Sequence, residues 1–198
     1  MIFVLGLGYR MRVGKDSVAD VLVERYGFRR YGFAEALKAE VLERFRDVLD
    51  VVARETYGSG IDHIERAREA LVRDLKPSVV RALLQNYGTE VRRRDDPQYW
   101  VDMLHTQILH RDRPTRAVVT DVRFRNEAAW VHGVGGLLVR VDRGAPEQGS
   151  VSAHTSERDL AEYLGWDYIL KNDGTLDDLS AAVDRMVGLL LSLRGMGG

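Results

Sequence analysis

The apolar positions of the chain fall into short continuous runs and helical spacings. Residues 2–7 form a continuous apolar run that ends in glycines, which is typical of a central strand in a parallel sheet. Val18, Val21 and Leu22 then repeat at helical spacing, which predicts a helix over residues 17–26. The first unit of the chain is therefore a strand, a glycine loop and a helix.

The same alternation continues along the chain. Residues 28–33 alternate weakly as a short strand, and residues 34–52 predict one long amphipathic helix with Leu37, Val41 and Phe45 on one side. Further helices are predicted at residues 79–87 and 99–109, and further strands at residues 117–120, 137–141 and 168–170. Strands that alternate with helices predict an α/β fold, in which helices flank a central parallel sheet and ligands bind at the carboxyl ends of the strands.

One polar stretch interrupts this alternation. Residues 54–76 contain the loop-like YGSGID and then the charged, helix-favouring IERAREALVRDL, before Pro77 restarts the chain at a helix N-terminus. We expect a helical lid or acceptor-binding insertion at about residues 51–112, within a single domain that spans residues 1–198.

The composition of 45% hydrophobic and 30% charged residues over 198 residues is that of one globular domain. A net charge of -1 provides no field for a nucleic-acid polymer, and the lack of cysteine excludes disulfides, thiolate metal sites and cysteine nucleophiles. No apolar stretch approaches the ~20 residues of a membrane span and the first residues lack a basic leader, so we expect a cytoplasmic protein without a membrane partner. Arginine carries nearly all the positive charge, because the only lysines are Lys15, Lys38, Lys76 and Lys171.

A candidate phosphate site lies between the first strand and the first helix. Gly14-Lys15-Asp16-Ser17 stands where backbone N–H groups and the helix dipole can hold phosphates. In that setting Lys15 would reach the β- and γ-phosphates, the Ser17 hydroxyl would bind Mg²⁺, and Asp16 would orient Ser17 or a metal-bound water.

The spacing of this loop departs from the phosphate-loop pattern. That pattern places four residues between its two glycines, but its first glycine position is Tyr9 here, and Gly8 lies one residue earlier. One explanation is a loop with one extra residue. The alternative to a phosphate site is a glycine turn that caps a helix and leaves the lysine exposed.

Four later segments, together with GKDS, closely resemble the bacteriophage deoxynucleoside monophosphate kinases. The segments are YGFAEALK at residues 31–38, RALLQNYGTE at residues 81–90 with YWV at residues 99–101, TDVRFRNE at residues 120–127 and KNDGT at residues 171–175. The resemblance covers the chain in order, except for about residues 51–76. It implies a P-loop kinase fold, ATP and Mg²⁺ as cosubstrates, a deoxynucleoside monophosphate as acceptor, often a homodimer, and the host cytoplasm as location if the protein is phage-encoded.

An acceptor phosphate is largely ionised near pH 7, because its second pKa is about 6, so the reaction needs charge neutralisation and alignment more than a general base. Arg123 follows the strand predicted to end at Asp121, and its planar fork suits a phosphate; the alternative is a structural salt bridge. Arg81 lies on a helix that leads to a predicted turn at Gly88 and Thr89. By resemblance, the acceptor pocket includes Gln85, Gly88, Thr89 and Trp100.

Several site residues keep two interpretations. Asp121 would hold the Mg²⁺ water shell or hydrogen-bond the acceptor sugar. Glu127 would orient Arg123, touch the sugar, or form an i,i+4 ion pair on a surface helix. Lys38 matches a family lysine, but its helix also carries glutamates and is equally compatible with a solvated face. By resemblance, Asn172 and Gly174 approach the ATP base, although Asn-Asp-Gly is also good turn chemistry.

The remaining charged residues are weaker candidates. Arg140 and Arg143 flank a strand end, where lid arginines or simple surface charges are both expected. Arg92 or Arg93 would touch the acceptor phosphate, or form part of a compensated turn. His154 lies in a segment similar to the family, but the five histidines lack ligand spacing, so neither zinc nor a catalytic histidine is expected.

Two other functions remain open from the sequence. Another small-acceptor P-loop kinase, such as a dephospho-coenzyme-A kinase or a ribonucleoside monophosphate kinase, would share the sheet and the loop. A nucleotide-binding protein without transfer activity would show no acceptor-dependent turnover.

Overall fold

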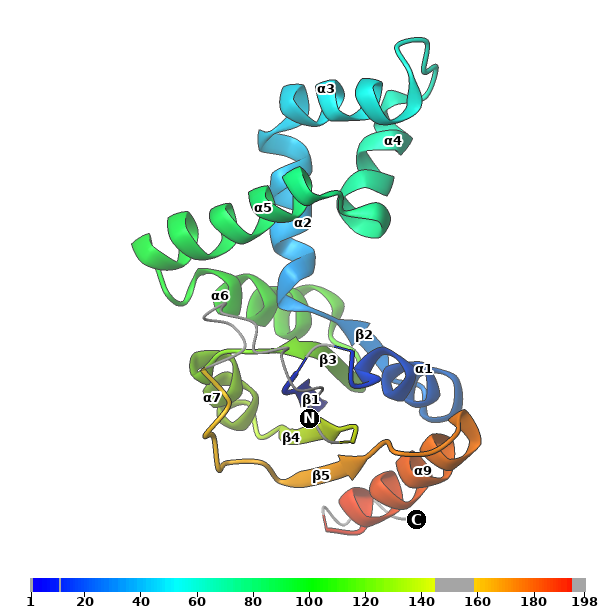
Figure 1. Ribbon diagram of the computed structural model, residues 1–198. Coiled ribbons are helices and arrows are strands. Elements are labelled where there is room, and N and C mark those ends of the chain that lie inside the picture. The colour runs from blue at the N-terminus through cyan, green and yellow to red at the C-terminus, as the bar shows by residue number, and fades with distance from the viewer. Residues whose placement is uncertain (1, 11, 145–158, 194–198) are drawn as a thin grey trace. The chain divides into compact units, whose positions relative to one another are not determined.

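The computed structural model describes residues 2–10, 12–144 and 159–193, and the chain divides into two compact units (Figure 1). We call Met1–Gly32 with His105–Gly198 the sheet unit, and Phe33–Leu104 the helical unit. No helix in the described part of the chain is both long and apolar enough to cross a membrane.

The sheet unit contains a five-stranded sheet in the order β2-β3-β1-β4-β5, in which every neighbouring pair is parallel. Its strands are β1 (Phe3–Gly8), β2 (Arg29–Tyr31), β3 (Arg116–Val122), β4 (Leu137–Asp142) and β5 (Tyr168–Lys171). All six residues of the central strand β1 are buried, which explains its continuous apolar run. The five predicted strands and the α/β fold class are confirmed.

Helices cover both faces of this sheet. Successive side chains of a strand point to opposite faces, and Leu5 and Leu7 of β1 share a core with Leu22 and Met186 of the helices α1 (Lys15–Tyr26) and α9 (Leu176–Leu193). The other face carries α7 (Arg125–Gly133), since a Cβ on Gly6 would lie 3.0 Å from the side chain of Val131 in that helix. The sheet unit also contains a π-helix, η3 (Thr106–Asp112).

The helical unit contains no strand among its residues, all of which are described. Its elements are α2 (Phe33–Arg44), α3 (Arg46–Tyr57), α4 (Ile64–Ala70), the π-helix η1 (Leu71–Leu75), α5 (Ser78–Gln85), the π-helix η2 (Asn86–Arg93) and α6 (Tyr99–His105), whose last residue belongs to the sheet unit. The unit begins and ends earlier than the insertion predicted at about residues 51–112.

One predicted helix and one predicted turn differ from the structure. The single helix predicted over residues 34–52 is broken at Phe45, whose backbone leaves the helical region with φ −111° and ψ 30°. The Phe45 ring packs edge-on against Tyr87, with ring centroids 5.1 Å apart, so tertiary packing overrides a continuous helical pattern. The turn predicted at Gly88 and Thr89 is also absent, because both residues lie inside η2.

Candidate functional site

The parallel sheet brings three predicted site segments to one edge. Gly8 at the end of β1 pairs with Val122 at the end of β3 and with Arg140 of β4. The last paired residue of β5 is Lys171. The phosphate loop, Arg123 and Asn172 each follow directly after a strand, so they leave the sheet at the same carboxyl edge.

The phosphate loop ends in the N-terminus of α1. Gly14 is the N-cap residue with φ 92° and ψ 22°, and as a glycine it has no side chain that could cap the first N–H groups of the helix. Asp16 is exposed and Ser17 is half-buried in the first turn. A helix N-terminus at the carboxyl end of a buried strand is an anion-binding geometry.

Lys15 is buried rather than exposed. Its side chain is 8% exposed, and its amine donates a hydrogen bond to the backbone carbonyl of Arg10 in the loop. This excludes the capped turn with an exposed lysine that the sequence left open, because the amine folds back over the loop where phosphate oxygens would lie.

Tyr9 takes the backbone conformation of the glycine that it replaces. Its φ of 91° lies in the left-handed region that favours glycine, whereas Gly8 is still part of β1. No extra residue is needed to explain the loop spacing. A Cβ on Gly8 would lie 2.6 Å from the ring of Trp166, so glycine at that position leaves room for the indole.

Aromatic and cationic contacts hold the Tyr9 side chain. The guanidinium of Arg140 lies 3.8 Å from the centre of the Tyr9 ring and that of Arg10 lies 5.0 Å from it. The Tyr9 ring is also edge-on to Trp166, at 6.5 Å between centroids. Arg140 is further paired with Asp142 at 3.0 Å, so it is engaged in the sheet unit, while Arg143 is exposed.

Asn172 holds the phosphate loop through a hydrogen bond. It is buried, and its Nδ2 donates a hydrogen bond of 2.9 Å to the carbonyl of Val13. A Cβ on Gly14 would lie 2.3 Å from the same amide nitrogen, so the loop backbone and Asn172 are in close contact. Gly174 is exposed two residues later, against the side chain of Asp178. The structure therefore links Asn172 to the phosphate loop, which sequence spacing did not indicate.

Asp121 and Arg123 stand at the end of β3. Asp121 lies inside this strand rather than after it, because β3 continues to Val122. Its carboxylate approaches the end of β2, where a Cβ on Gly32 would lie 3.0 Å from Oδ2. A carboxylate and a hydroxyl, as Asp121 and Ser17 carry, are oxygen ligands that suit Mg²⁺, which takes one or two protein oxygens and completes its shell with phosphates and water.

Glu127 fixes the backbone that carries Arg123. Its side chain is 1% exposed, and Oε2 accepts hydrogen bonds from the N–H groups of Arg123 at 2.7 Å and Phe124 at 3.1 Å. The prediction of an i,i+4 ion pair on a surface helix is therefore wrong for Glu127. This glutamate is the third residue of α7, and its side chain turns back to cap the start of the helix. Within the described ranges, no carboxylate pairs with the Arg123 guanidinium.

In the helical unit, Trp100 supports Gly88. The indole is 2% exposed, and its Nε1 donates a hydrogen bond of 3.1 Å to the Gly88 carbonyl. A Cβ on Gly88 would lie 2.7 Å from the side chain of Leu37, so α2 and η2 approach closely there. This buried position suits an indole that holds the η2 backbone.

The other predicted acceptor residues of this unit are accessible. Arg81 and Gln85 are exposed on α5, and Thr89 is half-buried in η2. Lys38 is 18% exposed and pairs with Glu35 at 2.5 Å, so it is not on a freely solvated face.

A network around Glu40 ties α2, η2 and α6 together. The carboxylate accepts hydrogen bonds from the hydroxyl of Tyr87 at 2.6 Å, from the hydroxyl of Tyr99 at 3.1 Å and from the guanidinium of Arg92. Arg92 also lies 4.5 Å from the centre of the Tyr99 ring. Arg92 is thus engaged within the unit. Sequence reasoning missed Glu40, because no pattern pairs it with residues about fifty positions away.

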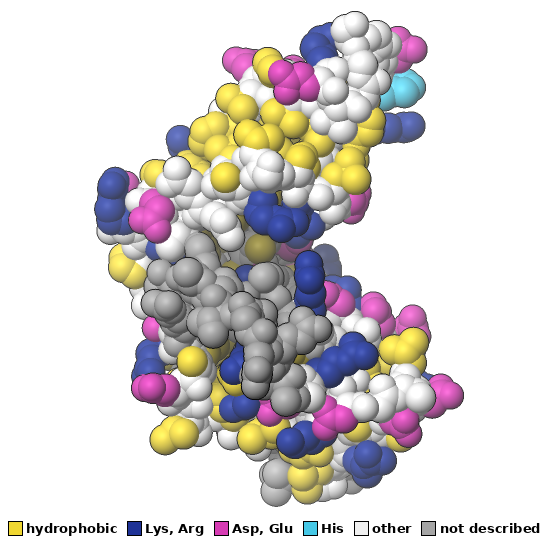
Figure 2. All heavy atoms as spheres, viewed as in Figure 1, with side chains coloured by type: hydrophobic (Ala, Val, Ile, Leu, Met, Phe, Trp, Pro, Cys, Tyr) yellow, Lys and Arg dark blue, Asp and Glu magenta, His cyan; other side chains and the backbone are white. Residues whose placement is uncertain are grey.

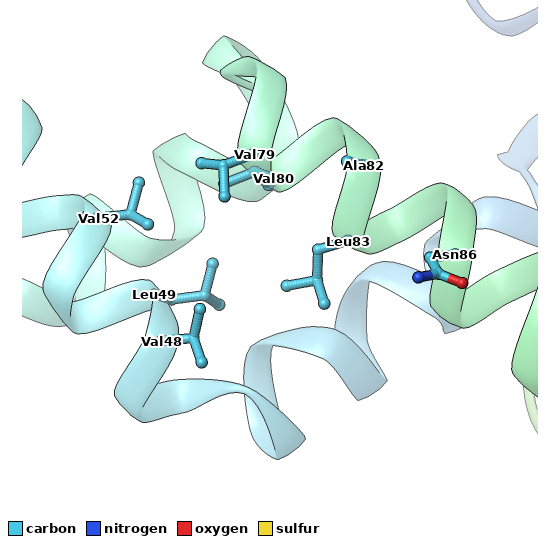
Figure 3. Close-up of a pocket in the computed structure, with 8 residues that line it drawn as sticks. All are labelled: Val48, Leu49, Val52, Val79, Val80, Ala82, Leu83 and Asn86. Atoms are coloured by element: carbon cyan, nitrogen blue, oxygen red, sulfur yellow. The ribbon is translucent and has the colours of Figure 1, made fainter.

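The helical unit also contains an apolar pocket of about 240 Å³. Figure 3 shows Val48, Leu49 and Val52 of α3 facing Val79 and Leu83 of α5 across it. Hydrophobic side chains gather over these two helices in Figure 2. No residue of the predicted site lines this pocket.

Two further predictions from the sequence concern His154 and zinc. His154 falls outside the described residues. Among the residues that are described, no three histidine or carboxylate side chains form a metal cluster.

The left-handed conformation of Tyr9 predicts an unusual order of stability. Replacement by glycine removes backbone strain of about 1 kcal/mol that alanine retains, while both lose the ring contacts. Tyr9→Gly should therefore have a higher free energy of unfolding than Tyr9→Ala, measured by urea denaturation. At the exposed helical position Val23 the order should be reversed, since glycine costs about 1 kcal/mol there relative to alanine. Equal stability of the two Tyr9 variants would contradict the strain.

The Glu40 network predicts a pH-dependent contribution to stability. Burial raises the pKa of the Glu40 carboxyl, but the hydrogen bonds from Tyr87, Arg92 and Tyr99 outweigh burial, so the pKa lies below its ordinary value. A lowered folded-state pKa stabilises the fold above the unfolded-state pKa, and this contribution is lost as the pH falls through the folded-state pKa.

Glu40→Gln should cost about 2 kcal/mol in the free energy of unfolding at pH 7, and distinctly less near pH 3. The control is Glu43→Gln, an exposed glutamate of the same helix, which should change stability by less than about 0.5 kcal/mol. A cost for Glu40→Gln that is the same at both pH values would exclude the charged network.

Comparison of the sequence with known proteins identifies its family. A family model described as deoxynucleotide monophosphate kinase matches residues 48–183. A putative deoxynucleotide monophosphate kinase of Acanthamoeba polyphaga mimivirus is 28% identical over 182 residues, which cover 86% of this chain and 88% of the viral protein.

Two solved structures are also similar. A protein of Thermus thermophilus has a TM-score of 0.47 at 18% identity, and the dephospho-CoA kinase of Campylobacter jejuni has a TM-score of 0.47 at 15% identity. Each similarity covers 96% of this chain and 98% of the other. Because the family model matches more than half of the sequence, the chain belongs to the deoxynucleotide monophosphate kinase family.

Proposed function

We propose that this nucleotide kinase transfers the γ-phosphoryl group of ATP, with Mg²⁺, to a deoxynucleoside 5′-monophosphate, and releases ADP and the deoxynucleoside diphosphate. The observation that carries the proposal is the buried Lys15, whose amine bonds to the loop carbonyl of Arg10 at the start of α1, at the carboxyl edge of a parallel sheet. Family membership supports the class of acceptor.

We assign two roles to the residues of the sheet unit: they neutralise the charge of the phosphates and align the reacting groups. A phosphate oxygen of the acceptor attacks the γ-phosphorus as the bond to the β-phosphate oxygen breaks, and negative charge spreads over the transferring oxygens. Lys15 and the N–H groups of α1 stabilise the β- and γ-phosphates. Ser17, and Asp121 through water, would hold Mg²⁺, which would neutralise phosphate charge. Arg123, with its backbone fixed by Glu127, aligns the phosphate of the acceptor.

Within the helical unit, we assign acceptor binding to the residues that the family resemblance indicates. Lys38, Arg81, Gln85 and Thr89 are polar, and accessible or half-buried. The Trp100 indole and the Glu40 network hold the η2 backbone that carries Thr89. Preorganised neighbours of this kind reduce the entropy lost when the acceptor binds.

The proposal is tested by ADP release from ATP and Mg²⁺ with the four deoxynucleoside monophosphates, AMP, GMP, CMP, UMP and dephospho-coenzyme A as separate acceptors. Turnover with deoxynucleotides supports the proposal and ranks the bases. Turnover only with ribonucleotides or dephospho-coenzyme A would retain the kinase and replace the acceptor. ATP binding without any turnover would indicate a binding protein.

Two variants separate the roles of the sheet unit. Lys15→Ala should reduce kcat by roughly 10²-fold or more with the fold retained, since it removes a preorganised charge from the transferring group. Arg123→Ala should lower kcat/KM for the acceptor by about tenfold or more and change KM for ATP by less than about twofold. Arg25→Ala, which removes an exposed arginine of α1, is the control and should retain full activity. Normal turnover of Lys15→Ala would contradict the phosphate loop.

A further inference from the structure

Three elements of the helical unit, α2, α4 and η1, are joined by ion pairs next to Lys38. Arg73 of η1 pairs with Glu35 of α2 at 2.6 Å, and the same glutamate pairs with Lys38 at 2.5 Å. Arg73 is also held by Glu69 at 2.5 Å. These ion pairs fix the end of η1 beside the turn of α2 that carries Lys38.

Lys76 follows directly after η1 in a constrained backbone. Its φ is 43° and its ψ is 61°, a left-handed conformation that glycine adopts more easily than lysine. Its amine donates a hydrogen bond to the carbonyl of Arg73, and the side chain is half-buried. A lysine in a position suited to glycine suggests that the amine itself has a role.

The surroundings of Lys76 are rich in positive charge. Burial lowers the pKa of the Lys76 amine, and the charges of Lys38 and Arg81 lower it further, against the opposite effect of Asp74 and Glu35. The charges of Lys38 and Arg81 therefore each act on the Lys76 amine. Like charges gathered at a half-buried position destabilise the free protein, and an anion bound among them removes that cost.

The start of α5 adds to the same positive region. Pro77 is the N-cap residue of this eight-residue helix, and its side chain has no polar atom that could cap the first N–H groups. These N–H groups follow Lys76 immediately and precede Arg81 by one turn. Lys38 of α2, Arg81 of α5 and the N-terminus of α5 thus add positive charge around Lys76, the residue that follows η1.

We infer that Lys76, together with Lys38 and Arg81, forms a binding site for a phosphate monoester dianion, the 5′-phosphate of the acceptor nucleotide. The identity of that ligand rests on the proposed function. Lys76 is then an acceptor-binding residue, and it is the last residue of the stretch 51–76, which the sequence resemblance does not cover.

The first test observes the lysines directly by NMR. Protein labelled with ¹³C at the lysine Cε should give four signals, one for each lysine of the chain, and Lys76→Arg identifies the signal of Lys76 by its loss. The Lys76 amine should titrate below an ordinary lysine in the free protein. Inorganic phosphate and a deoxynucleoside monophosphate should each shift the Lys76 signal and raise its titration midpoint, because a bound anion favours the charged amine.

The signal of Lys171, which lies in the sheet unit, is the internal control and should not move with inorganic phosphate. If phosphate and the monophosphate both leave the Lys76 signal unchanged, the site does not exist. A Lys76 signal that responds only to ATP would overturn the assignment to the acceptor. Because this measurement needs no turnover, a shifted signal in a protein without kinase activity would reject the proposed function and retain the anion site.

The second test separates the effect of the Lys76 amine on acceptor binding from the effect of its backbone conformation. Lys76→Gln should raise KM for the deoxynucleoside monophosphate by about tenfold and leave KM for ATP within about twofold. Lys76→Arg should restore most of the acceptor affinity. Lys76→Gly relieves the backbone strain but should remain as defective as Lys76→Gln.

Arg66→Gln is the matched control, because it removes one exposed positive charge from α4 of the same unit. It should leave both KM values unchanged. An acceptor KM restored by Lys76→Gly would show that the position acts through its backbone and would overturn the inference.

Discussion

The parallel pairing of β1 with β3 and β4 is the constraint on which the site in the sheet unit depends. Gly8 pairs with Val122 on one side and Arg140 on the other, so residues far apart in sequence leave the sheet at one edge. This register places the phosphate loop, the end of β3 and the β5 turn at the same edge. A register shift by one residue would turn the buried side chains of β1 to the wrong faces, so burial and site geometry are set together.

The phosphate loop shows how a nonstandard residue is accommodated. Tyr9 adopts the conformation of a glycine, and ring contacts with Arg140, Arg10 and Trp166 offset the strain. Asn172 fixes the other end of the loop through the carbonyl of Val13. The backbone that would face the phosphates is therefore positioned by side chains from β4 and from the turn after β5.

The helical unit is organised by charge as much as by apolar packing. Glu40 joins α2, η2 and α6 through two tyrosines and an arginine, while Glu35 joins α2 to η1 through Arg73. Opposite charges are satisfied in both networks. Lys38 also belongs to the Glu35 network, and the positive charges of Lys38 and Arg81 act on the half-buried Lys76 amine, where we propose the anion site.

The sequence by itself determined the five strands, the helix after the phosphate loop and the place of Lys15 at the start of that helix, because apolar runs and glycine positions are local signals. It also indicated Arg123 as a candidate site residue through its position after a strand, and Arg81 through its place on a helix that leads to Gly88 and Thr89. The break at Phe45, the burial of Glu127 and Trp100, and the contact of Asn172 with the loop were decided only by the tertiary structure. Each of these depends on partners from other elements, and a carboxylate or indole has the same local pattern whether it faces solvent, a ligand or a backbone N–H group.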